Sequence, residues 1–201
     1  FVTLFRGAAG TGKSFALGEV NRALREACHK SCVLAPQRQQ VKDLERDGFT
    51  GAQTVSEFLT RKQMPAGGVV IIDEAGQLAA KQMLELLRFV KGNNGRVILS
   101  GDTRQHGAVE ASDALRAIER YSGLGAAELN EIRRQDPARG RTEKEKAWIA
   151  EYKQAVKQAA NGEIAASFAR LEKAGAVLEC TLADQQERLA AEYLELAAAQ
   201  L

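Results

Sequence analysis

Short apolar segments alternate with amphipathic segments along the chain as far as Gly125. The apolar segments predict strands at residues 1–5, 31–36, 69–72 and 95–102. Between them, apolar residues recur at helical spacing and predict helices at residues 13–28, 38–48, 54–61, 79–91 and 111–123. The run from Val69 to Ile72 has no polar position, which is typical of a strand buried on both faces. This alternation predicts an α/β fold in which a mainly parallel sheet is flanked by helices.

The pattern changes after Gly125, where helical periodicity dominates. Helices are predicted at Glu143–Ala160 and Glu163–Ala174, followed by a short strand at residues 176–180 and a last helix from Asp184. The C-terminal part is therefore expected to be helix-rich. A chain of 201 residues with 45% hydrophobic content can form one sizeable core, which favours one domain over two.

Charge and cysteine content exclude several classes of protein. The 28 Lys and Arg residues nearly balance 26 Asp and Glu residues, so any nucleic-acid contact is expected to be local. Three cysteines form an odd and sparse set that favours a reducing compartment, with the cytoplasm as the expected location. Cys28, His29 and Cys32 lack a second ligand group at finger-like spacing, which disfavours a zinc site. No apolar run approaches the roughly 20 residues that cross a bilayer, so no membrane contact is expected.

A glycine-rich stretch lies between the first predicted strand and the first predicted helix and fits the pattern G-x-x-x-x-G-K-[ST]. Its glycines let backbone N–H groups turn toward phosphate oxygens, and Lys13 adds a positive charge for the terminal phosphates. Ser14 offers a hydroxyl to Mg²⁺. The alternative, a turn that binds nothing, is disfavoured by the flanking strand and helix. The residues predicted to bind the nucleotide are Gly7, Gly10, Thr11, Gly12, Lys13, Ser14 and Phe15.

Two acidic residues, Asp73 and Glu74, follow the apolar run that ends at Ile72. One carboxylate at a strand tip can hold Mg²⁺ and its waters, and a neighbouring one can accept a proton from an attacking water. We assign the first role to Asp73 and the second to Glu74. An acid that activates water favours ATP hydrolysis, with ADP and phosphate as products. A small-molecule kinase or a nucleotide-dependent switch would also account for the phosphate loop.

The segment "SGDTRQH", Ser100 to His106, resembles motif III of superfamily 1 DNA helicases. The resemblance implies that Gln105 senses the terminal phosphate and relays its loss to the DNA-binding loops. The segment "LNEIRRQ" resembles the arginine motif of the same family, which implies that Arg134, or alternatively Arg133, contacts the terminal phosphate. The predicted catalytic residues are therefore Lys13, Glu74, Gln105 and Arg134.

Two further segments resemble DNA-contacting motifs of these helicases. "LAPQRQQ" resembles motif Ia, whose proline-containing loop touches the DNA backbone, and "AQTVSEFL" resembles the motif that follows it. The resemblance implies single-stranded DNA as a partner, with ATP and Mg²⁺ as ligands. The predicted DNA contacts are Pro36, Gln37, Arg38, Thr54 and Ser56.

The subgroup that the motifs resemble is the RecD-like branch, including the helicase portions of MobF-type conjugative relaxases. The resemblance implies a RecA-like motor domain at residues 1–182 and a helix at residues 183–201 that leads to a second RecA-like domain. That second domain would supply another arginine to the site. Because the first residue is not Met, the chain is expected to be part of a longer polypeptide.

Several sequence features limit how far this resemblance extends. The chain has two histidines, so the three-histidine cluster of a relaxase nicking domain is not in this sequence. The branch commonly inserts a strand-separating element where this chain has the short segment Lys62–Gly68, so translocation is better supported than unwinding. The competing hypothesis is a non-catalytic RecA-like module that binds a nucleotide or a partner. The presence of Lys13, Ser14, Asp73, Glu74 and Gln105 favours the motor.

Overall fold

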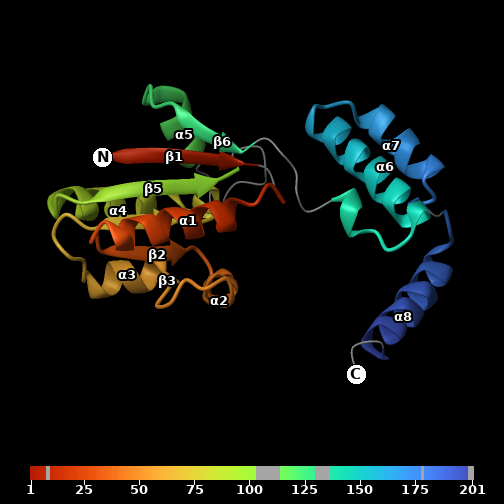
Figure 1. Ribbon diagram of the computed structural model, residues 1–201, viewed down its shortest axis with the longest axis horizontal. Coiled ribbons are helices and arrows are strands. Elements are labelled where there is room, and N and C mark those ends of the chain that lie inside the picture. Colours follow the sequence, from red (N-terminus) through yellow and green to blue (C-terminus); the bar gives the residue numbers. More distant parts are fainter. Residues whose placement is uncertain (8–9, 103–113, 130–135, 178, 199–201) are drawn as a thin grey trace. The chain divides into compact units, whose positions relative to one another are not determined.

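The computed structural model describes residues 1–7, 10–102, 114–129, 136–177 and 179–198 (Figure 1). The chain forms two compact units, Phe1–Arg134 and Gln135–Leu201. The first unit contains the sheet and the second is helical. The expected domain boundary after residue 182 stays a prediction.

The described strands of the first unit belong to one parallel sheet, with six strands in the order β3-β2-β4-β5-β1-β6. The strands are β1 (Val2–Gly7), β2 (Ser31–Ala35), β3 (Gln53–Thr54), β4 (Val69–Ile72), β5 (Arg96–Gly101) and β6 (Ala126–Leu129). Arg6 of β1 forms ion pairs with Glu119 and Glu128, which tie the strand to its neighbouring helix and to β6. The predicted α/β fold class, a parallel sheet flanked by helices, is confirmed.

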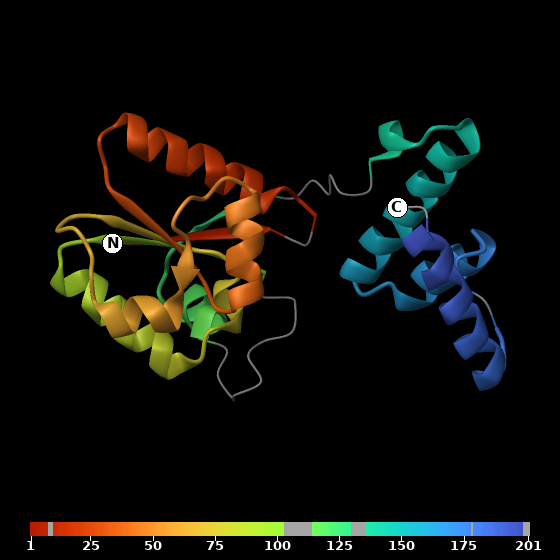
Figure 2. The same cartoon turned by 90° about the horizontal axis from the view of Figure 1, so that it is seen from below.

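Helices cover both faces of the sheet, with α1 on one face and α3 and α4 on the other (Figure 2). The helices of the first unit are α1 (Lys13–Glu26), α2 (Arg38–Arg46), α3 (Val55–Arg61), the 3₁₀ turn η1 (Ala75–Gln77), α4 (Ala80–Gly92) and α5 (Ala114–Tyr121).

Alternate residues of β4 enter two separate apolar clusters. Val70 and Ile72 pack with residues of α3, α4 and α5, whereas Val69 and Ile71 pack with residues of α1 and α2. Successive side chains of a strand point to opposite faces, so a strand covered on both faces carries apolar residues at every position. The unbroken apolar run of β4 is thus explained by its central place in the sheet.

The second unit contains the 3₁₀ turn η2 (Pro137–Arg139) and the helices α6 (Glu143–Ala160), α7 (Ile164–Lys173) and α8 (Leu182–Ala198). Helices α6 and α7 pack side by side (Figure 1). Trp148 of α6 donates its indole N–H to the carbonyl oxygen of Ala174 at 3.2 Å. Near the other end of α6, Ser167 donates its hydroxyl to the carbonyl oxygen of Ala155 at 2.8 Å.

Three elements differ from the prediction. The strand β6 was not expected, because its sequence "AAEL" has low strand propensity, and pairing with β1 decides its conformation. The predicted strand at residues 176–180 is wrong for the described residues of that segment, none of which pairs with a sheet. The last helix begins at Leu182 rather than at Asp184, because Thr181 accepts a hydrogen bond from the backbone N–H of Asp184 and caps the helix.

Candidate nucleotide-binding and catalytic site

The phosphate loop and the acid pair each follow the carboxyl end of a strand in the parallel sheet. Strand β5 lies between β1 and β4, and because all three are parallel, their carboxyl ends form a continuous edge. Ile72 pairs in register with Leu99, which places the next residues, Asp73 and Ser100, side by side. The phosphate loop leaves the same edge after Gly7.

The described part of the phosphate loop folds tightly against the start of α1. A Cβ atom at Gly7 would lie 2.6 Å from Oγ1 of Thr11 and 3.1 Å from Cγ of Lys13, so the loop leaves no room for a side chain at this position. Gly12 has φ +85°, a backbone conformation that glycine adopts without steric cost. Ala8 and Ala9 lie outside the described residues.

Lys13, the first residue of α1, is 8% exposed, and its Nζ donates a hydrogen bond to the carbonyl oxygen of Gly7 at 2.8 Å. The ammonium group is therefore held over the start of the loop. The N-terminus of α1 carries a partial positive charge at the same place, so the loop is suited to an anion. Thr11 is also buried, at 4% exposed.

Asp73 is held in one orientation by two hydrogen bonds to the same oxygen. The hydroxyl of Ser100 and the backbone N–H of Glu74 each donate to Oδ1 of Asp73 at 3.0 Å. Both side chains are buried, with Asp73 8% exposed and Ser100 fully buried. Asp73 also lines a cavity. A carboxylate held in this way is the type of ligand that suits a hard cation such as Mg²⁺.

Glu74 lies at a turn in which its backbone adopts φ 52° and ψ 39°, a left-handed conformation that is uncommon for a residue with a side chain. Burial raises the pKa of Glu74 above its ordinary value of 4.5, and the neighbouring charges of Asp73 and Asp102 raise it further, while Lys13 lowers it. A carboxylate with a raised pKa is a stronger base, which suits proton transfer from water. A left-handed backbone and a raised pKa both recur at functional sites, which agrees with the role predicted for Glu74.

A cavity of about 330 Å³ brings these groups together. Ser14, Asp73 and Glu74 line it, and so do residues of α2 and η1 that the sequence did not single out. Ser14 and Asp73 therefore line one space, and their side chains carry oxygen atoms, the type of donor that Mg²⁺ prefers. The additional lining residues are Gln40, Asp43, Leu44, Asp47 and Gln77.

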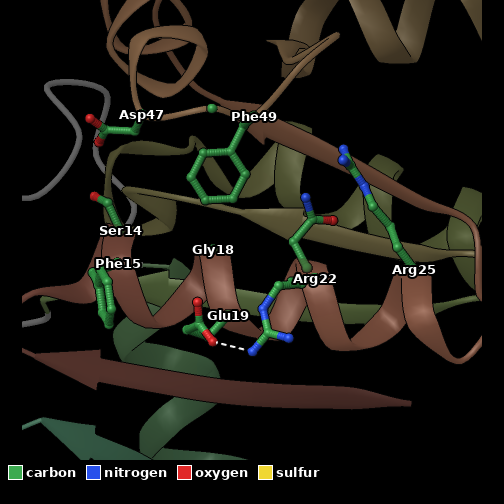
Figure 3. Close-up of a pocket in the computed structure, with 10 residues that line it drawn as sticks. Ser14, Phe15, Gly18, Glu19, Arg22, Arg25, Asp47 and Phe49 are labelled. Atoms are coloured by element: carbon green, nitrogen blue, oxygen red, sulfur yellow. Dashed lines mark hydrogen bonds and ion pairs between the residues drawn. The ribbon is translucent and has the colours of Figure 1, made fainter.

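A second cavity, of about 550 Å³, lies between α1 and the turn that follows α2 (Figure 3). Figure 3 shows the ring of Phe49 above Gly18, with Arg25 farther along α1. Ser14 and Asp47 line both cavities, so the two spaces adjoin each other. Phe15, predicted to bind the nucleotide, lines this second cavity and is 72% exposed.

The predicted DNA-contact residues lie on two neighbouring segments at the same edge of the sheet. Strands β2 and β3 are paired, with Ala35 opposite Thr54, so the segments that follow them start side by side. Pro36 and Gln37 follow β2, Arg38 begins α2, Thr54 caps α3 and Ser56 lies in α3.

An ion pair joins these two segments. Nη1 of Arg38 donates to Oε1 of Glu57 at 2.7 Å. Oε2 of Glu57 in turn accepts hydrogen bonds from the backbone N–H and the hydroxyl of Thr54, at 2.9 and 3.0 Å. Ser56 accepts a hydrogen bond from the amide of Gln82 at 3.2 Å. The structure thus brings together the residues of the two predicted DNA-binding motifs.

Two predicted catalytic residues, Gln105 and Arg134, lie outside the described residues, as do the alternative Arg133 and the neighbouring His106. Their roles stay predictions. Sequence reasoning missed Ser100, although a polar residue at the end of an otherwise apolar strand was a usable signal. It also missed the contacts of Gln40 and Gln77, which nothing in the linear pattern indicates.

A family profile described as "AAA domain" matches residues 1–181. The chain belongs to this AAA-domain family. The match spans the phosphate loop, the acid pair and the motif segments that follow. It confirms the recognition of the first RecA-like motor domain of a superfamily 1 helicase of the RecD-like branch. For this AAA-domain chain, membership of a phosphate-loop family implies nucleotide binding.

Curated relatives of the AAA-domain chain are conjugal transfer proteins. "Probable conjugal transfer protein TraA" of Sinorhizobium fredii is 28% identical over 134 residues, which are 64% of this chain and 12% of that protein. "Conjugal transfer protein TraA" of Agrobacterium fabrum is 30% identical over 153 residues, which are 69% of this chain and 14% of that protein. The chain therefore spans a small part of the length of these relatives.

Among solved structures, the AAA-domain chain is similar to Bacteroides sp Pif1 in complex with ADP-AlF4. The TM-score is 0.48 with 15% sequence identity, and the match covers 76% of this chain and 42% of that chain. Among the described residues, no helix combines the length and the apolar composition needed to span a membrane.

Proposed function

We propose that this chain is the ATP-binding and ATP-hydrolysing motor domain of a single-stranded-DNA translocase or helicase within a larger conjugative relaxase or related helicase. The observation that carries the proposal is the single cavity that Ser14, Asp73 and Glu74 line together. Ser100 and the backbone of Glu74 hold Asp73 in place there. A purely structural sheet has no need of a buried acid and a half-buried acid near a buried lysine.

The roles of the residues follow from their positions. Lys13 and the N-terminus of α1 stabilise the negative charge of the terminal phosphates. Ser14 and Asp73 would hold Mg²⁺, which supplies charge neutralisation to the phosphate oxygens when bound. Glu74 accepts a proton from the attacking water, and its raised pKa matches it to that task.

The remaining roles rest on the motif resemblance. Gln105 senses the terminal phosphate, and Arg134 stabilises the charge that develops on the transferred phosphoryl group. Pro36, Gln37, Arg38, Thr54 and Ser56 contact the backbone of single-stranded DNA. A second RecA-like domain of the parent chain completes the ATP site, so turnover by the 201-residue chain alone is expected to be weak.

Two measurements test the proposal. The first is binding of Mg-AMP-PNP to the chain by calorimetry, with Lys13→Ala as the negative variant. The second is phosphate release from ATP with and without single-stranded DNA, in a polypeptide that also carries the second RecA-like domain. Glu74→Gln is expected to bind the nucleotide but release no phosphate, whereas Glu85→Gln, an exposed acid on α4, is expected to match the wild type. Absence of nucleotide binding by the wild-type chain would overturn the proposal.

A nucleotide-binding chain whose phosphate release is unaffected by both DNA and Glu74→Gln would point instead to the non-catalytic module. These outcomes separate the motor from a binding domain, because only in the motor do the Glu74 side chain and the DNA both change the rate of phosphate release.

A further inference from the structure

Gln77, the last residue of η1, joins two parts of the site that are far apart in the sequence. Its Oε1 accepts hydrogen bonds from the side-chain amides of Gln37 and Gln40, each at 3.0 Å. Gln37 precedes α2 in the loop predicted to contact DNA, and Gln40 lies in the first turn of α2. One oxygen of η1 therefore holds two amides at the start of α2.

The hydrogen bonds determine which way these amides face. Oε1 of Gln40 accepts the backbone N–H of Gln37 at 3.0 Å, so the Nε2 group of Gln40 is the one that faces Gln77. Gln77 must then present its oxygen, because two amide N–H groups cannot bond to each other. An amide oxygen has two lone pairs, which the two donors occupy.

The other side of Gln77 is tied to the acid pair. Its backbone N–H donates to the carbonyl oxygen of Glu74 at 3.0 Å, which closes the single turn η1 directly after the acids. Within this turn Ala75 is fully buried. Gln40 and Gln77 also line the same cavity as Asp73 and Glu74. Gln77 therefore links the Glu74 turn to the Gln37 loop through one side chain.

The strained backbone of Glu74 favours a change in the conformation of the η1 turn. The left-handed backbone of this residue is uncommon, and a turn with such a residue can switch to a second arrangement when a ligand bonds the side chain. Coupling between two ligands requires an element whose equilibrium both of them bias. The turn η1 with its Gln77 bridge is a described element that touches both the acid pair and the predicted DNA loop.

We propose that Gln77 is a positioning residue that couples nucleotide binding at the acid pair to single-stranded-DNA binding at the Gln37 loop. The inference rests on the proposed function, since it assumes that both ligands bind. In this proposal Gln77 itself contacts neither the nucleotide nor the DNA. The hydrogen bonds from Gln37 and Gln40 transmit a change in the Glu74 turn to the start of α2. A change at the start of α2 is transmitted to the Glu74 turn in the same way.

The test measures the affinity of the 201-residue chain for fluorescein-labelled oligo(dT), with and without saturating Mg-AMP-PNP. The ratio of the two dissociation constants is the coupling factor, expected to be at least about fivefold in the wild type, in either direction. Gln77→Ala is expected to bring the ratio to within about twofold of unity while each ligand alone still binds. Gln39→Ala is the matched control. Gln39 lies in α2 beside Gln40, but its amide donates to Oδ1 of Asp43 at 3.4 Å rather than to Gln77.

A second variant separates coupling from a structural role. Gln37→Ala removes one donor of the bridge, and the Gln37→Ala/Gln77→Ala double variant is expected to show the same coupling ratio as Gln77→Ala alone, because the two residues act through one contact. A merely structural residue would weaken both affinities and leave the ratio unchanged.

The outcomes are distinct. Loss of coupling in Gln77→Ala but not in Gln39→Ala supports the inference. A wild-type ratio retained in Gln77→Ala overturns it and leaves the proposed function intact. A wild-type chain that binds neither ligand overturns both.

Discussion

Ser100 donates its hydroxyl hydrogen to Oδ1 of Asp73 at 3.0 Å from the adjacent strand. The bond forms because β4 and β5 are paired in register up to Ile72 and Leu99. The residues that follow this pair, Asp73 and Ser100, therefore lie next to each other. A buried carboxylate needs such donors to stay ionised at low cost. The strand pairing thus presents the predicted metal ligand in a fixed orientation.

Ser100→Ala is expected to lower the free energy of unfolding by about 1–3 kcal/mol, because it removes a donor from a buried carboxylate. It should also weaken the Mg²⁺ dependence of nucleotide binding, since Asp73 then keeps only the hydrogen bond from the backbone N–H of Glu74 and is held less firmly. Thermal unfolding and a Mg²⁺ titration check both effects. The exposed Ser122→Ala should change stability by less than about 0.5 kcal/mol. Equal stability of the two variants would contradict the prediction.

Lys13→Ala is expected to weaken the binding of Mg-AMP-PNP by about 10- to 100-fold, because a charged hydrogen-bond donor to the phosphates is lost. Calorimetric titration measures the change. Lys91→Ala removes an exposed lysine near the end of α4 and serves as the control of equal charge. If both variants bind the nucleotide like the wild type, the phosphate-loop assignment is wrong.

Glu57 gives a prediction about pH. The backbone N–H and then the hydroxyl of Thr54 hold the pKa of Glu57 below its ordinary value of 4.5, with smaller contributions from Arg38 and Arg61. A lowered folded-state pKa adds stability above the unfolded value, and that stability is lost as the pH falls through the folded value. Glu57→Gln is therefore expected to be less stable than the wild type above pH 4.5, with the difference vanishing in stronger acid.

Chemical denaturation at a series of pH values measures this difference. Thr54→Val removes the hydroxyl donor and keeps the backbone N–H, so it should retain part of the pH-dependent stability. A Glu57→Gln variant that differs from the wild type equally at every pH would mean that lost packing, not charge, causes the effect.

Arg38→Ala is expected to weaken single-stranded-DNA binding and to reduce the slope of log affinity against log salt by about 0.7, the value for one phosphate contact on a single strand. Fluorescence anisotropy with oligo(dT) at several salt concentrations gives the slope. Arg46→Ala is the matched control, since this arginine on the same helix is paired with Asp43 and was not assigned to DNA. An unchanged slope in Arg38→Ala would remove this residue from the DNA surface.

Phe58→Ala is expected to lower the free energy of unfolding by about 3–5 kcal/mol, because the ring is fully buried. It also packs edge-on against Phe89, with 5.5 Å between ring centroids. Phe15→Ala, in which an exposed ring is removed, should leave stability nearly unchanged. Urea unfolding compares the two variants, and similar losses would show that the assigned core is misplaced.

Much of the fold could be predicted because the strands carry strong local patterns. The apolar run of β4 and the glycine-rich loop before Lys13 are each recognisable within a few residues. Strand β6 could not be predicted, because "AAEL" has no such pattern and is extended through its pairing with β1. Conversely, residues 176–180 are apolar enough for a strand but pair with none in the described part of the chain.

The sequence by itself determined the types of group at the site: a lysine and a hydroxyl in a phosphate loop, then two acids after a buried strand. These follow from short motifs whose spacing is set by local backbone geometry. Only the tertiary structure decided which groups meet. Ser100 reaches Asp73, and Gln77 reaches Gln37, through pairing and packing of segments distant in the chain. Such contacts depend on which strands and turns become neighbours in the sheet, which a short local motif does not specify.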